Sequence, residues 1–570
     1  MTTLLKNGKV VNVFIDRIEE ADVLIEDGRI IGVGDYDTAD TVVDLEGRYV
    51  CPGFIDGHIH IESTMLLPRE LAKVCVPHGT AAITADPHEI ANVCGVDGIR
   101  FFMDASRGIP LRCYFMLPSC VPATRFDESG AELSAADIDG LYALPQVLGL
   151  AEMMNYPGVV MGDPGVLEKI RKAREKGKVI NGHAPLLSGH DLDRYIAQGV
   201  QDDHECSDFN EALEKLRKGQ WIMIREGTSA RNLEALLPLF DEPYNRRAIL
   251  ATDDRHPYDL LTEGHIDHVI REAVRLGKSP LTAIRMATIQ AAQCLGIPWT
   301  GAVAPGYTAD LLVLDDLEKV DIRDVYHEGR PVYQNKELLP FEEEDPAAQE
   351  KNDRIFRSVH LKTQKAEDFA IAPEGDTCRV IGAIPGSLLT REIIRRVDLP
   401  HGNGVDTARD IIKIAVCERH AATGHIGLGL IEGLGILHGA IASTVSHDSH
   451  NLIIAGANEE DMALAGNRAA ELGGGLVVVK DGKVLAEMAL PVGGIVSEKS
   501  AAEVAAENRL VREAAKELGT REGIEPFMNL AFISLSVIPS LKITTGGLID
   551  VDRQTPVSLF TDEKLEEETV

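Results

Sequence analysis

Residues 53–299 of this chain repeat one cadence of apolar strand, polar loop and amphipathic helix. The strand candidates are AAITAD, GLAEMM, KVIN, WIMI and RAILATDD. Such alternation is typical of parallel strands joined by helical crossovers. The length suits a (β/α)8 barrel of about 250 residues better than an open doubly wound sheet, because no glycine-rich dinucleotide fingerprint follows the first strand. The sequence therefore predicts an α/β fold with a TIM-like barrel at its centre.

Strand-rich segments flank this region on both sides. In residues 1–52, Asn7-Gly8 and Asp27-Gly28 each sit between alternating apolar residues, as the turns of β-hairpins do. Residues 300–340 contain a Pro305-Gly306 turn followed by the apolar run LLVL. We expect the two segments to pair across the barrel as one small composite β-sandwich.

The chain beyond the barrel predicts a further domain. Residues 341–372 lose apolar periodicity and gain charge, which indicates a linker. Residues 373–570 mix strand and helix patterns, with a hairpin expected about Asp481-Gly482, and this mixture favours an α+β domain. The acidic end TDEKLEEETV is most simply a solvated tail.

Composition limits the partners and the compartment. Acidic residues outnumber basic ones by 90 to 57, a net charge of -33, which disfavours binding to nucleic acid or to anionic membrane surfaces. The nine cysteines include no CxxC pair, which fits reduced thiols in the cytoplasm. We expect neither export nor membrane insertion, since the N-terminus does not look like a signal peptide and no run of about 18 apolar residues occurs.

Polar residues at the ends of the strand candidates form a candidate metal site. In GFIDGHIHIES the side chains alternate, so Asp56, His58 and His60 should share one face of a strand. Two imidazoles at the end of a barrel strand can bind one divalent ion, although a polar strand face explains HxH equally well. Residues at later strand ends are Glu152, His183, His204 and Asp253. Each alone could be a loop-facing polar residue, but the set offers only nitrogen and oxygen donors, which suits Mn, Fe or Zn.

Two further groups could complete a site. DPHE places Asp86, His88 and Glu89 in one loop after the second strand, where they could contact substrate or relay a proton, or could be structural. Glu205 and Asp254 follow inward-facing residues and should point away. In the third domain, six candidates lie close in sequence: His420, His425, His438, His447, Asp448 and His450. The segment SHDSHN could close over the active site or hold another ion, or could be ordinary loop polarity.

The order of these residues resembles the amidohydrolase superfamily: HxH, a strand-four ligand, two single histidines and a final aspartate. Within it, several segments look like the adenine deaminase family: PGFIDGHIHIESTM, ADPHEIANVCG, INGHAPLLSG, DDHECS and LATDDRHP. SHDSHN resembles the third domain of that family, and GAVAPGYTADLLVLD resembles the returning β-sandwich segment of the superfamily. The likeness covers nearly the whole chain.

The resemblance implies hydrolytic deamination of adenine to hypoxanthine and ammonia, in purine salvage, by a hydroxide that bridges two divalent metal ions. Mn is expected first, with Fe or Zn as alternatives. The implied ligands are His58, His60, Glu152, His183, His204 and Asp253. Many hydrolytic relatives bridge their metals through a carbamylated lysine, but VLGLAEMMNYPGV contains none, so Glu152 would take that place.

The resemblance also suggests roles for the other residues. Asp253 would accept the proton of the attacking water and return it to the leaving amine, with His88 and Glu89 as further catalytic candidates. The candidates for substrate binding are Asp86, His88, Glu89, His447 and Asp448. The expected partner is a small purine base, and a homodimer is the expected assembly.

Two other interpretations stay open. The chain could be another amidohydrolase that acts on a cyclic amide or an N-acyl substrate. It could also be a non-catalytic assembly protein with a barrel that has lost its site. Such a protein should lack several ligands, whereas this sequence offers all six.

Overall fold

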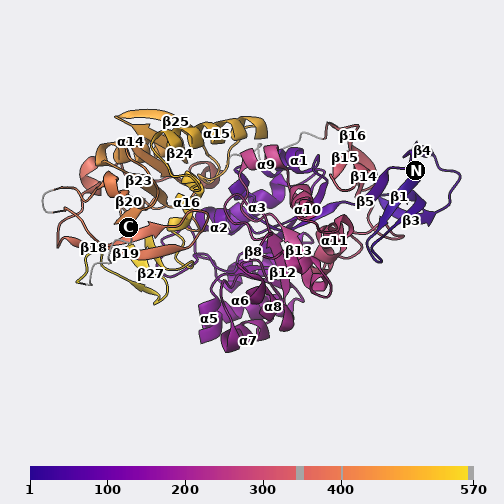
Figure 1. Cartoon of the computed structure of the whole chain (residues 1–570), viewed down its shortest axis with the longest axis horizontal. Coiled ribbons are helices and arrows are strands. Elements are labelled where there is room, and N and C mark those ends of the chain that lie inside the picture. Colours follow the sequence, from indigo (N-terminus) through magenta and orange to yellow (C-terminus); the bar gives the residue numbers. More distant parts are fainter. Residues whose placement is uncertain (342–351, 400–401, 563–570) are drawn as a thin grey trace.

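The computed structural model describes residues 1–341, 352–399 and 402–562. The molecule is elongated, with an N-terminal sheet at one end, a barrel in the middle and the C-terminal domain at the other end (Figure 1). The linker expected at 341–372 lies partly outside the described residues. So does most of the acidic tail.

Eight parallel strands form the central barrel. They are β6 (Phe54–Ile59), β7 (Thr80–Ala85), β8 (Arg112–Leu117), β9 (Val147–Met153), β10 (Val179–Gly182), β11 (Asp202–Asp203), β12 (Trp221–Arg225) and β13 (Ala248–Ala251). They pair in chain order from β6 to β10 and from β11 to β13. The first and last strands also meet, because the Asp253 amide donates to the His58 carbonyl at 2.9 Å and a parallel bridge joins Ile59 to Asp253. The predicted TIM-like barrel is confirmed.

Helices cover the outside of this barrel. They are α1 (Pro68–Cys75), α2 (His88–Cys94), α3 (Val96–Ala105), α4 (Ala135–Asp139), α5 (Tyr156–Met161), α6 (Pro164–Glu175), α7 (Gly189–Ala197), α8 (Phe209–Arg217), α9 (Pro257–Glu263), α10 (Ile266–Arg275), α11 (Pro280–Arg285) and α12 (Ala291–Cys294). In α10, Ile266, Val269, Ile270 and Ala273 are buried at the spacing of one helix face. At the start of α6, the Asp163 side chain accepts hydrogen bonds from two backbone amides, and Pro164 fits the first turn.

The N-terminal sheet has nine strands drawn from both sides of the barrel. They are β1 (Thr2–Asn12), β2 (Arg17–Glu26), β3 (Arg29–Gly34), β4 (Thr41–Asp44), β5 (Tyr49–Pro52), β14 (Leu311–Asp316), β15 (Asp321–His327), β16 (Arg330–Gln334) and β17 (Glu337–Leu338). Antiparallel pairing of β5 with β14 joins the two halves, as expected.

One predicted turn in this sheet is wrong. Asp27-Gly28 does turn between β2 and β3, with φ of 48° and 77°. Asn7-Gly8 instead lies within β1, where the register against β2 shifts between Leu5 and Gly8. Asn7 has a φ of 58°, and its amide donates to the carboxylate of Asp22 at 2.8 Å. The dipeptide therefore forms a bulge within β1, because the apolar residues before and after it both pair with strand β2.

The C-terminal domain mixes strands and helices, which confirms the α+β prediction. Its eight-stranded sheet contains β18 (Thr377–Ala383), β19 (Thr390–Arg396), β20 (Ile411–Cys417), β21 (Ile426–Glu432), β22 (Ala440–Ser443), β23 (Leu452–Gly456), β24 (Gly475–Lys480) and β25 (Lys483–Ala489). A smaller sheet contains β26 (Leu541–Thr544), β27 (Gly547–Asp550) and β28 (Thr555–Pro556). The helices are α13 (Asp353–Phe356), α14 (Glu459–Glu471), α15 (Ala501–Glu517) and α16 (Pro526–Ile533). The expected hairpin turn at Asp481-Gly482 joins β24 to β25.

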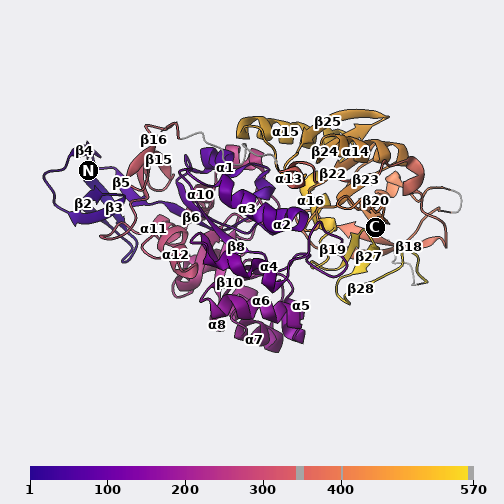
Figure 2. The same ribbon diagram turned by 180° about the vertical axis from the view of Figure 1, so that it is seen from behind.

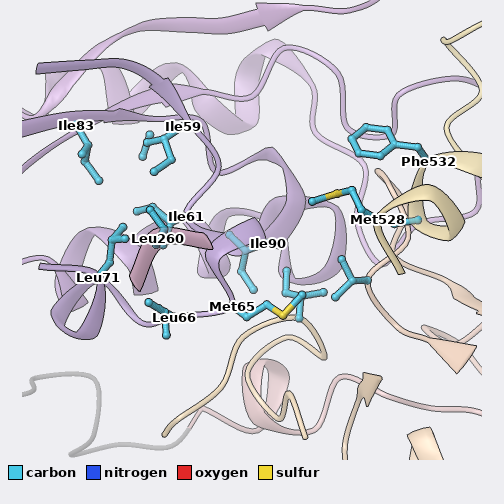
Figure 3. Packing of buried hydrophobic residues seen from close by; sticks show 14 of the residues in the cluster. Ile59, Ile61, Met65, Leu66, Leu71, Ile83, Ile90, Leu260, Met528 and Phe532 are labelled. Carbon is cyan, nitrogen blue, oxygen red and sulfur yellow. The ribbon is translucent and has the colours of Figure 1, made fainter. Parts of the chain in front are cut away.

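The C-terminal domain packs directly on the barrel. The Ser497 amide donates to the Met65 carbonyl at 2.9 Å, and the Ala501 amide donates to the Glu70 carboxylate at 3.1 Å. Seen from behind, α2 of the barrel lies beside α13 and α16 (Figure 2). One buried cluster contains barrel residues such as Ile59 and Ile90 together with Met528 and Phe532 of α16 (Figure 3). The two parts therefore share a continuous core.

Among the described residues, no helix combines the length and the apolar character that crossing a bilayer requires.

Candidate metal centre

His58 and His60 meet at the carboxyl end of β6. Their Nε2 atoms are 3.1 Å apart, and both side chains are buried. His58 lies in β6 and His60 follows its last residue, so the two are two residues apart in extended backbone and share a face. Burial and the neighbouring imidazoles of His204 and His60 hold the pKa of His58 well below its usual range. A neutral imidazole is the form that can bind a cation.

Glu152, near the end of β9, lies between two pairs of histidines. Its Oε1 is 3.3 Å from Nε2 of His60 and 3.7 Å from Nε2 of His58. Its Oε2 is 2.6 Å from Nδ1 of His183 and 3.3 Å from Nε2 of His204. Although burial opposes it, contact with His183 holds the pKa of Glu152 well below its usual range, so the carboxylate is ionised.

Asp253 follows β13 on the same mouth of the barrel. Its Oδ1 is 3.2 Å from Nε2 of His60 and 3.6 Å from Nε2 of His58. Its Oδ2 accepts a hydrogen bond from Arg225, at the end of β12. Burial opposes ionisation, but the Arg225 guanidinium and His60 hold the pKa of Asp253 well below its usual range. One oxygen is thus fixed by an arginine and the other faces the histidines.

The structure brings all six predicted ligands together, and their chemistry fits divalent ions. Among the groups whose ligand atoms lie within 4.8 Å of one another are His58 with His60 and Asp253, and His58 with Glu152 and His204. His183 joins them through Glu152 and leaves its own Nε2 buried without a partner. Buried polar atoms with no protein partner are costly unless an ion or water satisfies them. Imidazole and carboxylate donors suit Mn, Fe and Zn.

The DPHE loop also reaches this cluster. His88 begins α2, and its Nδ1 lies 3.2 Å from Oδ2 of Asp86 and 3.6 Å from Oε1 of Glu152. On its other side, Nε2 of His88 is 3.5 Å from Oδ1 of Asp448 in the C-terminal domain. His88 therefore connects the barrel cluster with the neighbouring domain.

Glu89 faces the same domain. Its Oε1 is 3.3 Å from Nδ1 of His447 and its Oε2 is 3.5 Å from Nε2 of His450. Burial opposes the charge on His447, but the contact with Glu89 raises the pKa of His447 to about 9. His447 is thus a cation at neutral pH, in contact with a carboxylate from the barrel.

The C-terminal histidines do not act as one group. His447 and Asp448 line the cavity above the cluster, and His450 lies behind them against Glu89. His420 instead contacts the Ser449 carbonyl at 2.7 Å. His425 pairs with Glu128 near the surface, and His438 is exposed. His447 and Asp448 of SHDSHN thus lie at the cavity, while His447 and His450 together with Glu89 form a further group whose ligand atoms lie within 4.8 Å of one another. Whether the segment covers the active site or holds another ion stays a prediction.

Two residues expected to point away face the cavity instead. Oε1 of Glu205 is 3.4 Å from Nε2 of His204 and 3.6 Å from Nδ1 of His183. Strand β11 ends at Asp203, so alternation no longer applies at Glu205. Asp254 also lines the cavity and accepts a hydrogen bond from Oγ of Ser63 at 2.5 Å. The preceding residue, Asp253, has a φ of 60°, and this turn reverses the expected direction.

Sequence reasoning missed the apolar wall of the cavity. Opposite the ligands lie four residues of the C-terminal domain: Leu388, Phe532, Leu535 and Ile538. The ring of Phe532 stacks on His447 with centroids 4.2 Å apart. These residues carry no chemical signal in the sequence, and no periodicity links them to the barrel.

A parallel barrel with buried histidines and carboxylates at the carboxyl ends of its strands is the arrangement of a metal-dependent hydrolase. The model of the amidohydrolase family matches residues 49–343, and that of the adenine deaminase C-terminal domain matches residues 387–555. The chain belongs to the adenine deaminase family of amidohydrolases.

Relatives match along nearly the whole length. An adenine deaminase of Desulfatibacillum aliphaticivorans is 44% identical over 98% of this chain and 97% of its own. An adenine deaminase of Kosmotoga olearia is also 44% identical, over 98% of this chain and 96% of its own. A solved dihydropyrimidinase from Brevibacillus agri NCHU1002 covers 60% of this chain and 96% of its own, with 17% identity and a TM-score of 0.48. The family assignment depends on the two family models and the full-length relatives.

Proposed function

We propose that this protein is an adenine deaminase, which hydrolyses adenine to hypoxanthine and ammonia in purine salvage. The observation that carries the proposal is that the site needs both matched regions: the barrel supplies the six ligand candidates, and the C-terminal domain supplies His447 and Asp448. Proteins named adenine deaminase match both regions together.

Two divalent ions are the proposed cofactor, with Mn²⁺ first and Fe²⁺ or Zn²⁺ as alternatives. His58, His60, Asp253 and Oε1 of Glu152 would hold one ion, and His183, His204 and Oε2 of Glu152 the other. When bound, such ions acidify water so that hydroxide is available near neutral pH.

The proposed proton carrier is Asp253. Because Arg225 binds Oδ2, Oδ1 stays directed at the cavity, where it can accept the proton of the attacking water. The same oxygen can return that proton to the amino group at C6 of adenine, so that neutral ammonia leaves. Without this transfer the leaving group would be a far more basic amide anion.

The remaining polar residues would hold the purine. Adenine offers ring nitrogens that accept and N–H groups that donate, so it needs partners of both kinds. His447, charged through its contact with Glu89, can donate, and Asp448 can accept. Asp86, His88 and Glu89 are the further substrate contacts that we propose, with His88 and Glu89 placed to relay protons.

We further expect a cytoplasmic homodimer that binds small purine bases. All nine cysteines are free and buried, which suits a reducing compartment. Size-exclusion chromatography with light scattering tests the assembly.

A substrate panel tests the proposed activity. Mn-loaded protein should release ammonia from adenine and form hypoxanthine, and it should lose this activity after chelation and regain it when metal returns. Adenosine, guanine, cytosine and a cyclic amide are the comparison substrates. Ring opening of the amide without ammonia from adenine would reject the proposal, and so would full activity in protein that elemental analysis shows to be free of metal.

A further inference from the structure

Lys542 of β26 is a buried lysine without an acidic partner. Its side chain is fully buried, and no ion pair joins it to a carboxylate in the part of the chain that the structure describes. The other two fully buried lysines differ, because Lys215 pairs with Asp203 at 2.9 Å and Lys413 pairs with Glu459 at 2.5 Å. Burial lowers the pKa of Lys542 to about 7.

Stability alone does not explain a lysine at this position. Burying an amine without a counter-charge costs free energy, and an apolar side chain of similar size would avoid that cost. What the amine does provide is donors, and it uses them on two backbone carbonyls. Its Nζ lies 3.0 Å from the carbonyl oxygen of Leu388 and 3.0 Å from that of Phe532.

Those two carbonyls belong to the wall of the catalytic cavity. Leu388 lies in the turn before β19, and Phe532 lies in the last turn of α16. Their side chains face the ligand cluster from the C-terminal domain, and the ring of Phe532 stacks on His447. Figure 3 shows Phe532 and Met528 extending from α16 at the edge of the shared core.

Two backbone hydrogen bonds hold this turn beside the segments that flank α16: the Gly386 amide donates to the Gly523 carbonyl at 3.1 Å, and the Thr390 amide donates to the Pro539 carbonyl at 3.0 Å. The side chain of Asn529 donates to the carbonyl of Ser387 at 3.4 Å, which is a weak hydrogen bond. The Phe532 carbonyl also accepts hydrogen bonds from the backbone amides of Ser534 and Leu535, and a cation is favourable at this end of a helix. Lys542 therefore adds a further donor at the end of α16 and at the same time ties the helix to the neighbouring turn.

We propose that Lys542 is a positioning residue that sets the width of the purine cavity by holding Leu388 and Phe532 at a fixed separation. This inference rests on the proposed function, since the width matters only if a flat ring binds between this wall and the ligand cluster. Lys542 touches neither the ring nor the ligands. Its effect should thus appear in substrate affinity more than in the chemical step.

Lys542→Met in Mn-loaded protein tests the proposal. The variant keeps the volume of the side chain and removes both hydrogen bonds. We expect KM for adenine to rise roughly tenfold or more, as when a hydrophobic pocket loses its fit, while kcat changes less than threefold. Bound metal should stay at the wild-type amount, and the melting temperature should equal or exceed that of the wild type.

Two further variants make the test decisive. Lys483→Met, at an exposed position of β25, is the matched control and should leave KM and kcat unchanged. Leu388→Ala shortens the wall directly and should reproduce the rise in KM even if Lys542→Met does not fold. An unchanged KM for adenine in Lys542→Met or in Leu388→Ala overturns the inference. This holds even if kcat and the melting temperature fall together in that variant. Wild-type protein is assayed first, because its inactivity on adenine would overturn the proposed function instead.

Discussion

Removing the Arg225 guanidinium should destabilise the barrel by several kilocalories per mole. Nη1 of Arg225 donates to Oδ2 of Asp253 and to Glu205, and Nη2 donates to the second oxygen of Glu205 at 2.9 Å. All three side chains are at most 10% exposed. Arg225→Met would leave two carboxylates buried without their shared cation. Removal of one partner from a buried ion pair costs about 3–5 kcal/mol, and we expect that loss in metal-free protein.

Urea unfolding followed by tryptophan fluorescence measures this loss. The chain has 2 tryptophans, and Trp221 lies on β12 together with Arg225, so its emission reports on the barrel itself. Arg246→Met is the matched control, because Arg246 pairs with Glu242 at the surface and its loss should cost less than about 1 kcal/mol. In metal-loaded protein, the misplacement of Asp253 should also lower kcat by about 100-fold. If the free energy of unfolding of Arg225→Met differs from that of the wild type by less than about 1 kcal/mol, the ion pairs of Arg225 with Asp253 and Glu205 do not stabilise the barrel as argued.

Three further predictions follow from the site and from Lys542. Glu152→Gln should lower bound metal to one equivalent or less and abolish most activity, because one carboxylate faces both histidine pairs; elemental analysis that finds two ions would reject this role. His447→Gln should reduce kcat/KM for adenine by about 10- to 100-fold through loss of a charged donor, with metal content as the control. The pKa of Lys542 is about 7 in the folded state against a usual 10.5, so the unfolded chain binds the extra proton between these values. The free energy of unfolding of the wild type, measured against that of Lys542→Met, should therefore increase by up to about 5 kcal/mol as the pH rises from 7 to 10.5. If urea unfolding gives the same pH dependence for both proteins, this prediction is wrong.

Local periodicity was enough to predict the part of the site that stands at the ends of long barrel strands. His58 and His60 are two residues apart at the end of β6, and Glu152 lies near the end of β9, so alternation still applies there although the pairing register of both strands shifts. The same rule was wrong for Glu205 and Asp254. Both follow the end of a short strand, and the backbone there turns in a way that side-chain alternation does not describe.

The sequence could identify the reactive groups of the C-terminal domain but could not place them. SHDSHN contains three neighbouring candidates, and only the packing of this domain on the barrel decides that His447 meets Glu89 while His420 does not. Domain docking depends on the summed burial of apolar side chains such as Ile90 and Met528, which no local pattern encodes.

The apolar wall shows the same limit more sharply. Leu388 and Phe532 are distant in sequence, and the amine of Lys542 binds the backbone carbonyls of both. A metal cluster on the barrel alone could activate water, but it would offer a flat ring no opposite surface. The choice of substrate would then depend on the domain that brings no ligand to the proposed metal site. It follows that substitutions in β26 and in α16, which supply none of the proposed metal ligands, should alter substrate affinity while the ligand cluster stays intact.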